Sequence, residues 1–369
     1  MIPISKPTIT NKEIKSLVDV CKSGLLVQGA KVEEFENAVA KLCGVKYAIA
    51  LSNGTAALHT ALYAAGIGHG DEIITTPFTF VATANAILMQ GAIPVFVDIA
   101  PETYNMDPSK IEEKITKKTK AILPVDLYGQ IYDVEALQKI ANTHKLKIIE
   151  DACQSINASY KKQMAGSCGD AGCFSFYATK NMMTGEGGMI VTNDKKLTTI
   201  AKQFRSHGQP EHIRYEYFHL GYNYRMMDLV AAIGLVQLDR LETFTKNRIK
   251  NAALLTKGLA DIPGIIVPTV MKEHRHVFHQ YTIRVTNPFP LDRDQVAQYL
   301  NKRGIGTGIY YPKPLHLYSH LAKYLFKRDV FPISEQFSHQ VLSLPVHPLV
   351  SRKDIHHIIK TIRNIYEKN

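Results

Sequence analysis

Short apolar runs alternate with helical stretches through the first half of the chain, and this alternation restricts its possible folds more than any other feature. The apolar runs lie at 47–51, 72–76, 93–97, 121–125 and 147–150. Helical patterns separate them, near 55–66, 81–90, 107–115 and 133–145. Strands that alternate with helices form parallel sheets covered on both faces. We therefore predict an α/β fold with a mainly parallel sheet flanked by helices.

The pattern changes after Gly166. Short strands are predicted at 173–177 and 189–193 around a Gly-rich turn, and a helix is predicted from Met226 to Thr243. A mixed region follows, with a strand at 280–285 and helices near 293–303, 334–341 and 351–367. The length of 369 residues is enough for more than one domain. We expect a large α/β domain over 1–245 and a smaller α+β domain over 246–369.

Composition excludes several classes of protein. With 45% hydrophobic and 21% charged residues, the chain has the composition of a globular protein rather than a disordered one. It has no apolar run long enough to span a membrane, and no basic segment followed by an apolar one at its start. The five cysteines are irregularly spaced and complete no metal site. We expect reduced thiols, no metal and a cytoplasmic location.

The net charge of +11 is concentrated near the C-terminus. Residues 270–369 contain 15 Lys and Arg against 7 Asp and Glu. A basic region favours anionic partners such as nucleotides, phosphates or nucleic acid. A solvated basic surface is the simpler interpretation, and charge alone does not decide between them.

Two candidate binding features follow predicted strands. Ligands of open α/β sheets bind at the carboxyl ends of the strands. The turn at 52–58 consists of small residues and enters a helix, so its N–H groups suit a phosphate, although a plain strand–helix turn is the alternative. Asp151 ends a buried run, where an acid is costly without a partner, although it could also cap a helix.

Lys180 is the strongest local signal. It follows an apolar strand directly and precedes the Gly-rich turn at 184–188. Burial depresses the pKa of a lysine and makes its amine a nucleophile. A lysine, a carboxylate, a phosphate-binding turn and an aromatic side chain together match the requirements of pyridoxal phosphate (PLP).

These residues belong to longer strings that occur in a characteristic order. The strings are SNGTAAL, TTPFTFVATANA, PVDLYGQ, EDACQS, SFYATKNMMTGEGGM, GYNYRMMDLVAAIGLVQL, YYPKPLHL and LSLPVHP. In their order and spacing the chain resembles the DegT/DnrJ/EryC1/StrS family of PLP-dependent nucleotide-sugar aminotransferases. The resemblance covers essentially the whole chain and implies the aspartate-aminotransferase-like fold, type I.

The resemblance also implies a role for individual residues. Lys180 would hold PLP covalently and move the proton, and Asp151 would pair with the ring nitrogen of the cofactor. Further cofactor contacts are implied for Thr55, Ala56, Phe80, Gln154, Ser175 and, from the neighbouring subunit, Asn223. Substrate contacts are implied for Tyr311, His316 and His347.

The family implies the reactants and the assembly as well. An amino acid, typically L-glutamate, would donate the amino group, so the cofactor would alternate between PLP and pyridoxamine phosphate (PMP). The acceptor would be a deoxy-ketohexose linked to dTDP, UDP or GDP, in amino-sugar, polysaccharide or O-antigen biosynthesis. Active sites would be shared across a homodimer, with no nucleic-acid or membrane partner.

Two departures from the family pattern and two other functions stay open. Asp126 and Tyr177 stand where many relatives have His. Another PLP reaction on this fold, such as sugar dehydration or an amino-acid lyase reaction, is one alternative. A nucleic-acid-binding regulator is the other, although no helix-turn-helix or basic aromatic motif is evident. Lys180 favours transamination, because the related sugar dehydratases have histidine in its place.

Overall fold

The computed structural model describes residues 1–211, 213, 215–325 and 329–367. Its central element is a seven-stranded sheet in the order β1-β9-β8-β5-β4-β2-β3. The strands are β1 (Tyr47–Leu51), β2 (Glu72–Thr75), β3 (Ile93–Phe96), β4 (Thr119–Ile122), β5 (Lys147–Asp151), β8 (Ala171–Ser175) and β9 (Gly188–Thr192). β9 is antiparallel to both of its neighbours, and all other adjacent pairs are parallel. The predicted α/β fold with a mainly parallel sheet is confirmed.

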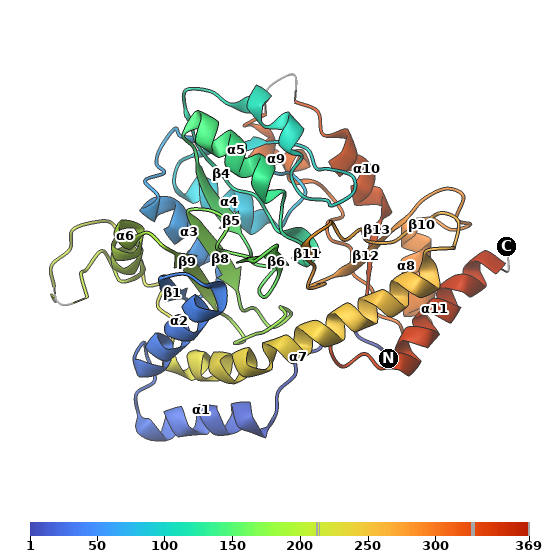
Figure 1. Cartoon of the computed structure of the whole chain (residues 1–369), viewed down its shortest axis with the longest axis horizontal. Helices are drawn as coiled ribbons and strands as arrows, with labels where there is room; N and C mark the ends of the chain where they lie inside the picture. The colour runs from blue at the N-terminus through green and yellow to red at the C-terminus, as the bar shows by residue number, and fades with distance from the viewer. Residues whose placement is uncertain (212, 214, 326–328, 368–369) are drawn as a thin grey trace.

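Helices cover both faces of this sheet (Figure 1). They are α1 (Asn11–Ser23), α2 (Ala30–Cys43), α3 (Gly54–Ala64), α4 (Val81–Met89), α5 (Val134–His144), α6 (Lys195–Arg205) and α7 (Asp228–Leu259). Side chains of α2, α5 and α7 form one core with the sheet, and those of α3, α4 and α6 form another. Successive residues of one strand, such as Ile73 and Ile74, enter different cores, because side chains alternate between the faces of a strand.

Local sequence explains where several helices begin. Thr10 and Glu13 form the expected capping box at the start of α1. The helix predicted at 107–115 is wrong, because this stretch forms two 3₁₀ turns, η1 (Pro108–Lys110) and η2 (Glu112–Lys114). The Asp107 carboxylate accepts hydrogen bonds from both the backbone N–H and the hydroxyl of Ser109, which favours a tight turn over a continuing helix.

The C-terminal region has its own sheet and core. Its antiparallel sheet has the order β10-β12-β13, formed by β10 (Ile265–Ile266), β12 (Tyr281–Val285) and β13 (Val341–Leu344). Around it lie α8 (Arg293–Asn301), the turn η4 (Leu315–Leu317), α9 (Ser319–Ala322), α10 (Pro332–Gln340) and α11 (Arg352–Glu367). A third small sheet, β11-β6-β7, connects the two regions through β6 (Ser159–Tyr160), β7 (Gln163–Met164) and β11 (His274–Arg275).

Helix α7 belongs to both regions. It is 32 residues long and runs from the seven-stranded sheet to α11 (Figure 1). Leu241 packs in the core of the large sheet, whereas Leu255 and Leu259 pack in the C-terminal core. The predicted domain boundary at 245/246 lies inside this helix, and Ile2 at the N-terminus pairs with Ile305 of the C-terminal region. The division at 245/246 stays a prediction.

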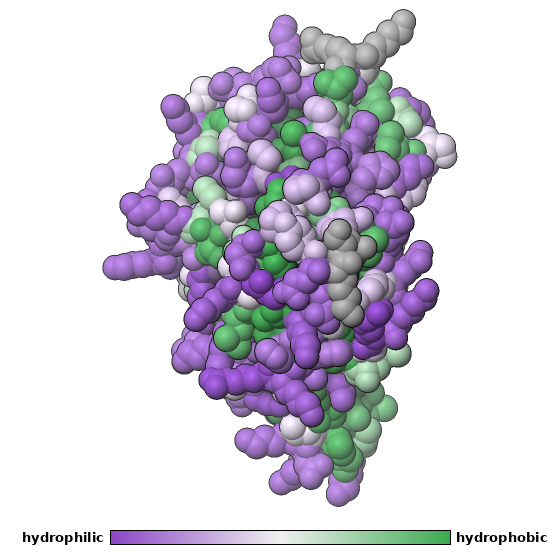
Figure 2. All heavy atoms as spheres, turned by 90° about the vertical axis from the view of Figure 1, so that its right-hand side faces the viewer, coloured by the Kyte–Doolittle hydropathy of each residue, from purple (hydrophilic) through white to green (hydrophobic). Residues whose placement is uncertain are grey.

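The surface is mostly polar on the face formed by the C-terminal region (Figure 2). Apolar side chains appear there in separate patches among hydrophilic ones. Among the described residues, no helix combines the length and apolarity that crossing a membrane requires.

Candidate active site

A cavity of about 1060 Å³ opens at the carboxyl edge of the large sheet. One wall, which we call the sheet wall, consists of residues that follow β1, β2, β5 and β8. They include Asn53, Gly54, Thr55, Ala56, Thr79, Phe80, Val81, Ala82, Asp151, Cys153, Gln154, Ser175, Tyr177, Thr179 and Lys180. The opposite, C-terminal wall consists of His279, Gln280, Tyr310, Tyr311, Pro312, Lys313, Leu315, Tyr318 and His320. The cavity thus lies where parallel sheets place their ligands.

Asp151 is the last residue of β5 and is held by neutral donors. Its side chain is buried and accepts hydrogen bonds from the Thr83 hydroxyl at 2.7 Å and from the Cys153 backbone N–H at 3.3 Å. The hydroxyl of Thr79 lies 3.0 Å from the hydroxyl of Thr83 and extends this hydrogen-bond network. These contacts fix the orientation of the carboxylate without neutralising its charge. Asp151 is therefore arranged to pair with a cationic group in the cavity.

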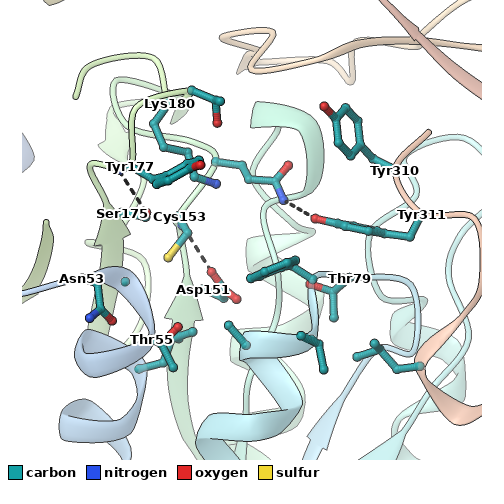
Figure 3. Close-up of a pocket in the computed structure, with 18 of the residues that line it drawn as sticks. Asn53, Thr55, Thr79, Asp151, Cys153, Ser175, Tyr177, Lys180, Tyr310 and Tyr311 are labelled. Atoms are coloured by element: carbon teal, nitrogen blue, oxygen red, sulfur yellow. Dashed lines mark hydrogen bonds between the residues drawn. The ribbon is translucent and has the colours of Figure 1, made fainter. Parts of the chain in front are cut away.

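Lys180 lies on the turn after β8, the strand next to β5. Its side chain points into the same space as Asp151 (Figure 3). Burial lowers the pKa of the Lys180 amine, and the nearby Cys153 and Asp151 oppose this effect. A lysine with a lowered pKa has more of the free amine that can attack an aldehyde carbon.

The turn that the sequence suggests for a phosphate lies at the start of α3. Gly54 is required because a Cβ there would lie 2.8 Å from Cβ of Ser175. The Asn53 side chain already accepts the N–H of Ala56 at 2.8 Å. A phosphate would therefore be bound first by Thr55 and Ser175. The predicted contact with the Ala56 N–H requires the hydrogen bond between this N–H and the Asn53 side chain to break. The turn, the carboxylate and the lysine together fit PLP.

Gln154 and Phe80, for which cofactor contacts are predicted, also line the cavity. Gln154 accepts a hydrogen bond from the Tyr128 N–H at 2.9 Å and directs its amide nitrogen toward the Tyr311 hydroxyl at 3.4 Å. Phe80 is 56% exposed, and its ring centroid is 6.3 Å from that of Tyr311. Tyr311 is thus the one predicted substrate contact that the structure places in the cavity.

Three other predicted residues lie outside the cavity. His316 is buried and bonds Glu335 at 2.9 Å, and His347 is buried and bonds the backbone oxygen of Pro3 at 3.1 Å. Both therefore pack within the fold and do not contact the cavity in this chain. Asn223 is exposed on the segment before α7, and its predicted role in a neighbouring subunit stays a prediction.

The residue that departs from the family pattern, Asp126, is fully buried behind the site. It accepts hydrogen bonds from the Ser155 hydroxyl at 2.6 Å and the Tyr132 N–H at 3.1 Å. Burial and the neighbouring Glu150 raise the pKa of Asp126 well above its usual value. Asp126 supports the turn that holds Gln154, whereas the second departure, Tyr177, is 47% exposed at the cavity.

Several residues of the site were not anticipated from the sequence. They are Thr79, His279, Lys313 and His320 in the lining and, outside it, Thr83 and Tyr128, which donate hydrogen bonds to Asp151 and Gln154. The string at 75–86 includes both threonines but does not reveal the bond from Thr83 to Asp151 or the one between the two hydroxyls. His279 and Lys313 lie on irregular segments, Tyr128 in a short 3₁₀ turn and His320 on the four-residue helix α9. Segments of these kinds are too short or too irregular for periodicity to predict an orientation.

Comparisons with known proteins agree with this geometry. The model of the DegT/DnrJ/EryC1/StrS aminotransferase family matches residues 7–363. GDP-perosamine synthase of Caulobacter vibrioides is 41% identical over 341 residues, covering 91% of this chain and 90% of that protein. A pleiotropic regulatory protein of Geobacillus stearothermophilus is also 41% identical, over 96% of this chain and 94% of its own length. The PLP form of Spr1654 from Streptococcus pneumoniae superimposes with a TM-score of 0.93 at 30% identity, covering 100% of this chain and 99% of the other.

The fold and the site define a PLP-dependent aminotransferase of fold type I. The chain belongs to the DegT/DnrJ/EryC1/StrS aminotransferase family. The structure of a relative in its PLP form supports PLP as the cofactor.

Proposed function

We propose that this protein transfers an amino group from an amino acid to the keto group of a nucleotide-linked deoxy-ketohexose, in amino-sugar biosynthesis. The observation that carries the proposal is the position of Lys180 and Asp151, which face one cavity from neighbouring strands. Membership of the aminotransferase family and the similarity to a GDP-perosamine synthase support it.

The residues divide the work between binding and proton transfer. PLP, when bound, withdraws the electron pair that remains after the substrate Cα loses its proton. Lys180 would hold the cofactor covalently and then, as a free amine, carry that proton at Nζ. Asp151, oriented by Thr83, would keep the ring nitrogen protonated. Thr55 and Ser175 would bind the phosphate, Gln154 the ring oxygen, and Phe80 the ring face.

The two substrates would use the same cavity in turn. We propose L-glutamate as the amino donor and a hexose carried by dTDP, UDP or GDP as the acceptor. The volume of about 1060 Å³ leaves room for a sugar beyond the cofactor. Lys313 and His320 on the C-terminal wall would face the charged nucleotide.

A homodimer would complete each site. Asn223 lies outside the cavity of its own chain and is exposed, so its amide is free to reach a second subunit. We propose that it binds the cofactor phosphate of the partner. Mixing inactive Lys180→Ala subunits with inactive Asn223→Ala subunits should then restore activity in mixed dimers, because one of the two sites carries neither change.

The direct test of the function uses the colour of the cofactor. The purified protein with PLP should absorb visible light, and L-glutamate should shift the band. Adding a nucleotide keto sugar from a panel with dTDP, UDP and GDP should restore the band and yield an amino sugar. Release of water or of carbon dioxide without an amino sugar would instead indicate a dehydratase or a lyase. Absence of any change with every amino acid and sugar would contradict the proposal.

A further inference from the structure

The segment that carries His279 is fixed firmly against the floor of the site. Arg248, a buried residue of α7, donates hydrogen bonds to the backbone oxygens of Phe278 at 3.1 Å and His279 at 3.3 Å. The turn that holds Gln154 lies on the other side of this segment, where a Cβ at Gly129 would be 2.9 Å from the backbone nitrogen of His279. The His279 backbone therefore has little freedom, and its ring lines the cavity in a defined position.

The ring of His279 has an unusual hydrogen-bond pattern. Within the described part of the chain, its Nδ1 is buried and has no hydrogen-bond partner. In His276, on the same segment, Nδ1 accepts the N–H of Phe278 at 3.0 Å. A buried N–H without an acceptor is rarer than an unpaired acceptor, so the proton of the neutral His279 ring belongs on Nε2. Burial, with Lys180 and Arg248 nearby, lowers the pKa of His279 well below its usual value.

The cavity lacks the cation that an amino acid would be expected to meet. Of the lining residues, all of which are described, only Lys180 and Lys313 are Lys or Arg. Lys180 is needed for the reaction, and Lys313 lies on an exposed turn. Neutral donors are available instead. Gln154 offers its amide N–H, because its oxygen is occupied by Tyr128, and His279 offers Nε2–H.

We propose that His279 binds the α-carboxylate of the amino donor through Nε2–H. This proposal rests on the proposed aminotransferase function. His279 and Lys180 line the same cavity, and they are near enough for the Lys180 charge to oppose protonation of the His279 ring. The amine of the donor must approach the position that the Lys180 amine occupies. The α-carboxylate is attached to the same carbon as that amine, so it arrives beside Lys180. A hydrogen bond from a buried neutral donor to a carboxylate is charge-assisted and strong.

The test separates the two half-reactions. His279→Leu removes the donor, whereas His279→Gln places an amide nitrogen near the position of Nε2. The apparent Kd for L-glutamate, measured from the visible band of the holoenzyme, should rise on the order of 10- to 100-fold in His279→Leu, as expected for a lost bond to a charged group. In His279→Gln it should stay within about threefold. The KM for the keto sugar should stay unchanged in both.

A donor without an α-carboxylate provides the sharper comparison. The amine 4-aminobutyrate keeps the distal carboxylate of glutamate but not the α-carboxylate, so wild type and His279→Leu should respond to it equally. Calorimetric titration with 2-oxoglutarate of each protein in its PLP form, with which this keto acid cannot exchange an amino group, gives a second measure that does not depend on turnover. His276→Gln is the matched control, because His276 lies on the same segment outside the cavity.

Three results would overturn the proposal. One is an unchanged affinity of His279→Leu for L-glutamate. Another is an equal loss with 4-aminobutyrate, which would indicate a general distortion of the site. A third is a selective rise in the KM for the sugar, which would assign His279 to the acceptor. If the wild-type band responds to no amino acid, the aminotransferase function itself is contradicted, and the role of His279 with it.

Discussion

The two walls of the cavity are built in different ways. On the sheet wall, Asp151 ends β5 and Lys180 lies on the turn after β8, the adjacent parallel strand, so the pairing of the two strands places this turn beside Asp151. On the C-terminal wall, Tyr310, Tyr311 and Lys313 lie on an irregular segment that is attached by a few bonds to the rest of the site. One joins the Tyr128 hydroxyl to the backbone oxygen of Tyr310, and another joins the Leu315 N–H to Pro77 at 2.8 Å.

This difference suggests a division of labour. Reaction chemistry needs groups held rigidly, whereas the choice of substrate can rest on loops that vary without disturbing the sheet. Substitutions in the sheet wall should therefore affect turnover with every substrate. Substitutions in the segment of the C-terminal wall that carries Tyr310, Tyr311 and Lys313 should affect mainly the KM for the sugar.

Lys180→Ala should have the largest effect. We expect turnover to fall by roughly 10⁴-fold or more, the size of effect seen when a reacting group is removed. Borohydride reduction followed by peptide mapping should attach the cofactor to Lys180 in the wild type and to no residue in the variant. Lys162→Ala, an exposed lysine outside the cavity, is the control. An adduct on another lysine would show that the sheet wall does not carry the reaction.

Asp151→Asn should have the next largest effect. If Asp151 pairs with the ring nitrogen as proposed, losing its charge should lower kcat by on the order of 10²-fold, as for other preorganised electrostatic groups. Thr83→Val keeps the charge but removes the 2.7 Å bond that orients it, and should cost about tenfold. Steady-state kinetics with each substrate would measure both. A near-normal kcat in Asp151→Asn would show that the Asp151 carboxylate has only a structural role.

His347 tests whether a histidine of the C-terminal region serves folding rather than binding. Burial lowers the pKa of His347 to about 4, from an ordinary value of 6.5. Between these values the unfolded chain binds a proton that the folded chain does not, so stability falls as the pH falls from about 6.5 toward 4. The wild type should lose about 1–3 kcal/mol more than His347→Gln between about pH 7 and pH 4.5.

Urea unfolding at the two pH values would measure this difference. Equal losses in the two proteins would contradict the buried neutral state of His347. A large rise in the KM for the nucleotide sugar in His347→Gln would instead support the substrate contact that the family resemblance implies for His347.

Lys313→Ala should have the smallest effect. Because Lys313 is exposed, its attraction to a diphosphate should change the KM for the sugar only about two- to fivefold at low salt. The effect should disappear as salt shortens the screening length below about 8–10 Å. Lys302→Ala, an exposed lysine outside the cavity, is the control. A salt-independent change in kcat would show that the C-terminal wall takes part in the reaction itself.

The sequence predicts the sheet wall better than the C-terminal wall. Strand periodicity and the placement of Asp151 and Lys180 at strand ends predict the sheet and one wall of the cavity, because register determines where strand ends meet. His316 and His347 follow Tyr-Pro and Leu-Pro segments that line the cleft in the family that the chain resembles, yet their side chains bond Glu335 and the backbone oxygen of Pro3 instead. Contacts on irregular segments depend on tertiary packing, which periodicity does not encode.

The continuity of α7 has a consequence for dissecting this protein. A chain cut after residue 245 would end midway through a helix of 32 residues, which is about 48 Å long. It would leave Leu255 and Leu259 on the other fragment, on a helix without the first part that anchors it to the large sheet. Neither fragment would retain an intact interior. Gene fusions and insertions should therefore leave helix α7 intact. To exchange substrate specificity between relatives, loops on either side of α7 should be replaced rather than the whole C-terminal half.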